Sequence, residues 1–212
     1  MKIVSAVGAK GGTGKSSVAL LLAWELSKKN RKVAIFDVDI QGTCVSAQEL
    51  NKSLPFKVYA VGNKRELIEL GDSISKENYD YLIIDGNPRS IHEDPELIEI
   101  IAQLSDLSLI VSRPTPKDLK AQIKYVNVVR ENTNGAVRIV WNFFQKQMKT
   151  HSSSILEGEK LLGISSLKNK IGLRAVYQDM GFSECYIGEM NNKYASEEIK
   201  SLCDEIIKVC NG

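Results

Sequence analysis

A glycine-rich segment near the start of the chain constrains the fold more than any other feature. It reads Val-Gly-Ala-Lys-Gly-Gly-Thr-Gly-Lys-Ser-Ser over residues 7–17, and it lies between an apolar run at 3–7 and another at 18–24. Glycines allow successive backbone N–H groups to turn inward, because residues with a Cβ do not readily adopt the angles required. A strand, such a turn and the start of a helix together form a cradle for polyphosphate.

The side chains of this segment have distinct expected roles. Lys15 can reach the outer phosphates of a nucleotide, and the Ser16 hydroxyl can hold Mg²⁺. Ala9 stands where the usual Gly-x4-Gly-Lys-Ser/Thr pattern begins, and Lys10 is an additional lysine before the paired glycines. The strand–loop–helix context disfavours the alternative, a glycine-rich turn with incidental lysines. The expected phosphate-binding residues are Lys10, Gly11, Gly12, Thr13, Gly14, Lys15, Ser16 and Ser17.

The length and composition of the chain indicate an ordinary globular protein. A chain of 212 residues, 43% hydrophobic and 25% charged, is long enough for one well-buried domain, which we expect to span residues 1–212. Its net charge of +2 does not by itself indicate a nucleic-acid partner. The apolar runs are too short for a secretory leader or a membrane span, so we expect a soluble, cytoplasmic protein.

The cysteine pattern argues against a metal cluster. Cys44, Cys185, Cys203 and Cys210 lack the spacing of metal ligands, and only Cys44 lies within the first 184 residues. An iron–sulfur cluster held by that part of the chain is therefore not expected. Reduced thiols are the expected state.

Strand-like and helical patterns alternate along the chain, which predicts an α/β fold with a mostly parallel, twisted sheet and helices on both faces. Residues 164–192 carry no clear pattern. The expected strands are 3–7, 33–36, 56–61, 81–84, 107–111 and 137–144, and the expected helices are 16–29, 63–70, 96–104, 117–131, 146–163 and 195–210.

Three aspartates follow predicted strands. Parallel strands end at one edge of a sheet, so we expect Asp37, Asp39 and Asp85 to lie near the phosphate loop. Asp37 and Asp85 are candidate Mg²⁺ ligands, together with Ser16. Asp39 is the candidate for positioning an attacking water, and the glycines after Asp39 and Asp85 indicate segments that respond to the γ-phosphate. Any one aspartate at a strand end is alternatively a turn or helix-cap residue.

Together these motifs resemble the deviant Walker A ATPases of the ParA/MinD group, a family of P-loop NTPases. The loop at 10–16, the Asp-x-Asp-x-Gln-Gly segment at 37–42 and the Leu-Ile-Ile-Asp-Gly segment at 82–86 carry the likeness. Within the group the chain is most similar to small ParA-type DNA-partition ATPases. Gly8 and Ile40 depart from residues common in the family.

The resemblance implies ATP and Mg²⁺ as cofactors and a weak ATPase that forms a homodimer with the nucleotides in its interface. Lys10 would then reach the phosphates bound by the partner subunit, while Lys15 serves its own. Lys10, Lys15 and Asp39 are the expected catalytic residues. Asn142 could contact adenine, although a buried or capping role is an equally good interpretation.

The family's partners are non-specific DNA and a ParB-like protein that stimulates hydrolysis, so the expected location is the cytoplasm, at the nucleoid. Between residues 146 and 174, Lys146, Lys149, Lys160, Lys168, Lys170 and Arg174 outweigh Glu157 and Glu159 (6 − 2 = +4). This basic segment is the candidate DNA contact, with a solvated lysine-rich face as the alternative. No helix-turn-helix pattern precedes the loop, and the acidic last helix favours docking on the domain over membrane binding.

Three alternatives remain open at this point. One is a ParA-like ATPase that positions another cargo. Another is an ATP-dependent ligase of the dethiobiotin synthetase type, for which Arg113 could bind an anionic substrate. The third is a DNA-binding scaffold that retains ATP as part of its structure and does not hydrolyse it. A reductase with a shared iron–sulfur cluster is disfavoured by the cysteine pattern.

Overall fold

The computed structural model describes residues 1–87, 94–178 and 192–212. Its strands are β1 (Lys2–Val7), β2 (Val33–Asp37), β3 (Lys57–Ala60), β4 (Tyr81–Asp85), β5 (Leu107–Ser112) and β6 (Ala136–Trp141). Its helices are α1 (Lys15–Lys28), α2 (Thr43–Leu50), α3 (Lys64–Ser75), α5 (Pro95–Leu104), α6 (Pro116–Asn132), α7 (Lys149–Leu162), α8 (Ala175–Gln178) and α9 (Lys193–Asn211).

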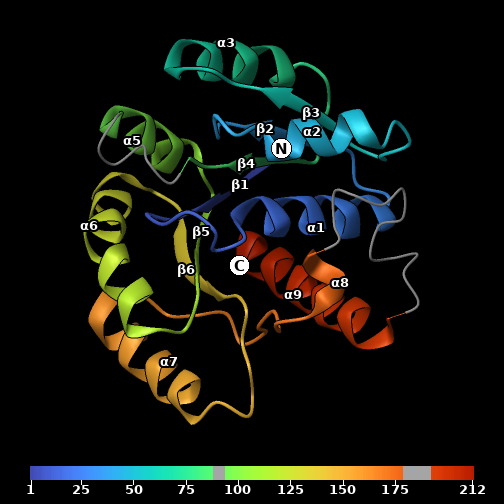
Figure 1. The fold of residues 1–212 in the computed structure, drawn as a ribbon. Coiled ribbons are helices and arrows are strands. Elements are labelled where there is room, and N and C mark those ends of the chain that lie inside the picture. The colour runs from blue at the N-terminus through green and yellow to red at the C-terminus, as the bar shows by residue number, and fades with distance from the viewer. Residues whose placement is uncertain (88–93, 179–191) are drawn as a thin grey trace.

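The strands form one parallel sheet in the order β3-β2-β4-β1-β5-β6. Alternate residues of each strand face opposite sides, so that Leu82 and Ile84 of β4 enter one core and Tyr81 and Ile83 the other. Helices α1, α2 and α9 cover one face, and α3, α5, α6 and α7 cover the other (Figure 1). The predicted α/β class, the parallel sheet and the helices on both faces are confirmed.

The predicted elements differ from the structure mainly at their ends. The helix expected at 63–70 extends to Ser75, and the helix expected at 146–163 begins only at Lys149. Helix α2 was not predicted. The last helix docks as expected, because Ile199, Leu202 and Ile206 enter the core beside α1.

Three described cysteines, Cys44, Cys203 and Cys210, are free and buried. Cys185 lies outside the described residues. Among the described residues, no helix has both the length and the apolar character needed to cross a bilayer.

Candidate nucleotide-binding site

The phosphate loop joins the end of β1 to the start of α1. Gly12 and Gly14 have φ angles of +69° and +87°, in the left-handed region that disfavours other residues. Gly14 is also a point of close approach, because a Cβ there would lie 2.1 Å from Asn142 Nδ2. The loop therefore needs glycine at position 14 for its backbone angle and for its packing.

The two lysines of the loop point to different surroundings. Lys15 is buried, and its Nζ donates to the Lys10 carbonyl at 3.0 Å across the loop. Burial lowers the pKa of Lys15, against the opposing effect of the Asp85 and Asp39 carboxylates. Lys10 instead forms an ion pair with the buried carboxylate of Asp118 on α6, and its side chain remains 35% exposed. Lys15 is thus built into its own loop, while Lys10 lies at the rim.

Distant side chains brace the loop backbone. Asn142 Nδ2, after β6, donates to the Thr13 carbonyl at 2.8 Å, and Arg113 donates to the Gly12 carbonyl. Gln122 on α6 accepts the Ala9 N–H at 3.0 Å. The structure thus gives Asn142 the buried, bracing position that the sequence left open, and its contact with adenine stays a prediction.

The sequence interpretation missed Gln122 and Asp118 as contributors to the site. A signal was present, since both are polar residues four apart on the apolar face of α6 that carries Leu119, Tyr125 and Val126. Buried polar side chains on such a face need partners, and here the partners belong to the loop.

The strand-end aspartates gather beside the loop as predicted. Asp37 Oδ2 accepts the N–H groups of Cys44 and Val45 at 2.9 and 3.0 Å, and Asp37 Oδ1 accepts that of Asp39 at 3.2 Å. Burial raises the pKa of Asp37, and these three hydrogen bonds oppose the shift. Asp39 is half-buried and its Oδ1 accepts the Gln41 N–H at 3.1 Å.

Asp85 is fully buried, and its hydrogen-bonding capacity is only partly used. Its Oδ2 accepts the Cys44 thiol at 3.3 Å, while its Oδ1 has no hydrogen-bond partner. Burial raises the pKa of Asp85 to about 7, against the effects of the Ser16 hydroxyl and Lys15. An orphaned carboxylate oxygen between Ser16 and Asp37 fits a divalent cation that prefers oxygen ligands, such as Mg²⁺.

One cavity borders the loop, and a second lies beside Arg113. The first, of about 350 Å³, is lined by Gly12, Gly14, Ser17, Leu21, Asn142, Phe143, Ile171 and Tyr177. Its apolar and aromatic lining beside the phosphate loop has the character of a base-binding pocket. The other, of about 400 Å³, is lined by Arg113, Thr115, Phe143, Gln145, Met148, His151 and Leu173.

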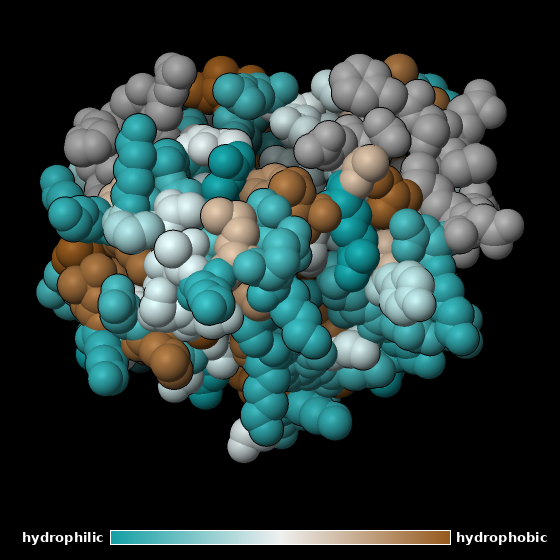
Figure 2. All heavy atoms as spheres, turned by 60° about the horizontal axis from the view of Figure 1, so that its bottom comes forward, coloured by the Kyte–Doolittle hydropathy of each residue, from teal (hydrophilic) through white to brown (hydrophobic). Residues whose placement is uncertain are grey.

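The basic segment at 146–174 is partly neutralised by α9. Arg174 pairs with Glu198 at 2.8 Å, and the Glu205 carboxylate accepts the Lys168 and Asn169 N–H groups at 2.7 and 2.9 Å. Including these two glutamates reduces the local charge from +4 to +2. Figure 2 brings the α7 side of the molecule forward and shows a mostly hydrophilic face with small, separate hydrophobic groups.

Sequence comparison gives relatives named for iron–sulfur chemistry. The chain is 35% identical over 75 residues to an iron-sulfur cluster carrier protein of Clostridium perfringens, a match that covers 35% of the chain and 23% of that protein. It is 24% identical over 229 residues to the cytosolic Fe-S cluster assembly factor cfd1 of Aspergillus clavatus, covering 96% of the chain and 72% of that protein. The expected proximity to partition ATPases is therefore not what these relatives indicate.

Structural comparison gives cell-division and partition proteins. The chain superposes on MinD in the MinC:MinD complex of Aquifex aeolicus with a TM-score of 0.82 and 15% identity, covering 98% of this chain and 96% of that one. A putative plasmid partition protein of Borrelia burgdorferi bound to AMPPNP superposes with a TM-score of 0.73 and 20% identity, and 98% of each chain is covered. The pNOB8 ParA bound to nonspecific DNA superposes with a TM-score of 0.70 and 12% identity, covering 99% of this chain and 98% of that one.

These likenesses, at 20% identity or below, concern the fold. The family follows from a direct match of residues 4–180 to the model of the CobQ/CobB/MinD/ParA nucleotide binding domain, which covers most of the sequence. With its bent phosphate loop, strand-end aspartates and parallel sheet, the chain belongs to the CobQ/CobB/MinD/ParA nucleotide-binding family.

Proposed function

We propose that the chain is an ATPase of the ParA/MinD type, which forms an ATP-dependent homodimer and positions a cargo such as DNA. The different surroundings of Lys10 and Lys15 support this proposal most strongly. Lys15 is buried inside its own loop, whereas Lys10 lies at the half-exposed rim, from which it can leave Asp118 and reach a second chain. ATP between two such chains would then receive positive charge from both.

Each residue of the site has a role in this proposal. The inward N–H groups of residues 11–16 and the Lys15 ammonium bind the phosphates, and the cavity lined by Phe143 and Tyr177 takes the base. Asp39 orients the attacking water. Ser16, Asp37 and Asp85 would hold Mg²⁺, which neutralises charge on the β- and γ-phosphate oxygens when bound.

Phosphate release from ATP tests the catalytic part of the proposal. We expect slow turnover, below ~1 s⁻¹, because positioning groups alone leave this reaction weakly catalysed until a partner completes the site. Lys15→Ala abolishes nucleotide binding and turnover, whereas the exposed Lys52→Ala leaves both unchanged. Wild-type turnover in Lys15→Ala would contradict the assignment.

The DNA partner is proposed from the basic segment at 146–174. Phosphate contacts give affinity without sequence preference, and a dimer doubles them. ATP-dependent binding to random duplex DNA is expected to weaken with salt and to fall in Lys168→Glu/Lys170→Glu. Lys52→Glu/Lys76→Glu, a matched charge change at exposed lysines elsewhere, leaves it intact. Unchanged binding in Lys168→Glu/Lys170→Glu would place the DNA contact outside this segment.

The cavity beside Arg113 favours a second candidate, an ATP-dependent ligase acting on a small carboxylate. The cavity has a volume of about 400 Å³ and is lined in part by Arg113. The same side chain donates a hydrogen bond to the Gly12 carbonyl of the phosphate loop. ATP turnover that requires a small carboxylic acid, and that is lost in Arg113→Ala, would support the ligase. Turnover stimulated by DNA together with a protein partner would support the positioning ATPase.

A further inference from the structure

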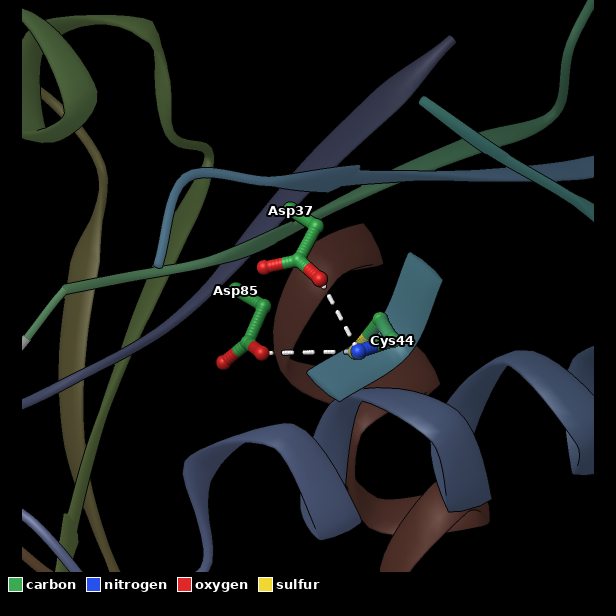
Figure 3. A group of neighbouring side chains, drawn as sticks. All are labelled: Asp37, Cys44 and Asp85. Carbon is green, nitrogen blue, oxygen red and sulfur yellow. Dashed lines mark hydrogen bonds between the residues drawn. The ribbon is translucent and has the colours of Figure 1, made fainter. Parts of the chain in front are cut away.

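Cys44 places a sulfur atom among the carboxylates of the candidate cation site. It lies near the start of α2 and is completely buried, and its thiol donates to Asp85 Oδ2 at 3.3 Å. Figure 3 shows Cys44 beside both carboxylates: its thiol contacts Asp85, and its backbone N–H contacts Asp37. One ligand atom from each of these three residues lies within 4.8 Å of the other two.

This ligand set differs in chemical character from one built for Mg²⁺ alone. Mg²⁺ prefers oxygen ligands, whereas a thiolate favours softer cations such as Zn²⁺, Cd²⁺ and Co²⁺. Zn²⁺ commonly takes four ligands drawn from cysteine sulfur, histidine nitrogen and carboxylate oxygen, at about 2.0–2.3 Å. One sulfur and two carboxylates supply three of the four, and the Ser16 hydroxyl or a water can supply the fourth.

The surroundings support a site that can be entered and filled. Asp85 Oδ1 is buried without a hydrogen-bond partner and can accept a cation without losing an existing contact. The segment that covers the group is open to solvent on its outer side, since Ile40 is 83% exposed and a Cβ at Gly42 would meet nothing within 4 Å.

We propose that Asp37, Cys44 and Asp85 form a binding site for a thiophilic divalent cation of the Zn²⁺ class. Binding forms a metal–sulfur bond and releases the thiol proton to solvent, with no change in oxidation state. The site shares its two carboxylates with the proposed Mg²⁺ position, so occupation by Zn²⁺ excludes Mg²⁺. Nucleotide is not required.

Titration of the metal-free full chain with Co²⁺ alone, in the absence of nucleotide, tests the proposal. Co²⁺ bound to a thiolate gives a sulfur-to-metal charge-transfer band in the near ultraviolet. We expect this band to saturate at one equivalent, to be removed by Zn²⁺, and to survive a ~100-fold excess of Mg²⁺, because softer ligands favour Co²⁺ and Zn²⁺ over Mg²⁺.

Matched variants locate the sulfur. The band disappears in Cys44→Ser and is retained in Cys203→Ser, which removes another buried thiol on α9. Asp85→Asn retains the sulfur but weakens Co²⁺ binding by ~10-fold or more, and it provides a second reading if Cys44→Ser does not fold. A wild-type chain without the band, or a band that persists in folded Cys44→Ser, would overturn the proposal. Because no nucleotide is present, neither outcome bears on the proposed ATPase.

Discussion

At the scale of single residues, the phosphate loop depends on side chains that are remote in sequence. Asn142, Gln122 and Arg113 lie 129, 113 and 101 residues from the loop atoms that they contact. The loop itself could be predicted, because its glycines and lysines are adjacent in the chain. The distant side chains that contact the loop could not be predicted, because no local sequence pattern indicates which of them bonds to a given backbone group.

Gly14→Ala tests the close packing of the loop. The new methyl group would meet Asn142 Nδ2 at 2.1 Å, at a backbone φ of +87°. We expect the free energy of unfolding, measured by urea denaturation, to fall by ~1–3 kcal/mol. Gly71→Ala is the matched control in α3, where a Cβ has nothing within 4 Å, and it should gain ~0.5–1 kcal/mol. Equal stabilities for the two variants would contradict the packing described here.

The buried carboxylate of Asp85 predicts a pH dependence of stability. Burial raises the pKa of Asp85 from its ordinary value of 3.8 to about 7 in the folded chain. Between these pH values the folded chain holds a proton that the unfolded chain releases. The free energy of unfolding should therefore fall as pH rises between these values, by up to ~1.4 kcal/mol per pH unit. Unfolding measured in chelator, compared with Asp85→Asn, isolates this contribution. An Asp85→Asn curve parallel to wild type would count against it.

At the scale of elements, four of the predicted helices, α3, α5, α6 and α9, begin with a local side-chain cap. Asn63 accepts the Glu66 N–H at the start of α3, and Thr115 accepts the Asp118 N–H at the start of α6. Helix α2 begins after Gly42 with no side-chain cap of its own. Its first N–H groups bond instead to Asp37, at the end of β2. A cap supplied by the preceding strand leaves no local signal at the start of α2.

Asp37→Ala should therefore loosen α2. Loss of two charge-assisted hydrogen bonds at the helix start is expected to cost ~1–2 kcal/mol and to expose its first turn. Hydrogen exchange at the Cys44 and Val45 amides should become faster by ~5- to 30-fold, the range that this energy implies. Asn63→Ala, which removes the cap of α3, should leave both amides unchanged. Unaltered exchange in Asp37→Ala would mean that another group caps α2.

At the scale of the whole molecule, the parallel sheet brings the phosphate loop, Asp37 and Asp85 to one edge. This arrangement was predictable, because alternating strands and helices imply parallel strands whose ends lie together. The division of the helices between the two faces was not, since α9 closes the core beside α1 although it is the last element of the chain. The same edge leaves Lys10 at its rim, held by Asp118, where a second chain can approach.

The mass of the protein in solution, measured by light scattering with ATP and Mg²⁺, tests the proposed dimer most directly. Asp39→Ala, which we expect to bind ATP but to hydrolyse it poorly, should have twice the mass of one chain. Lys10→Ala/Asp39→Ala should bind ATP and stay at the mass of one chain, because the lysine proposed to cross the interface is missing. An Asp39→Ala protein that is saturated with ATP yet remains a monomer would contradict the account.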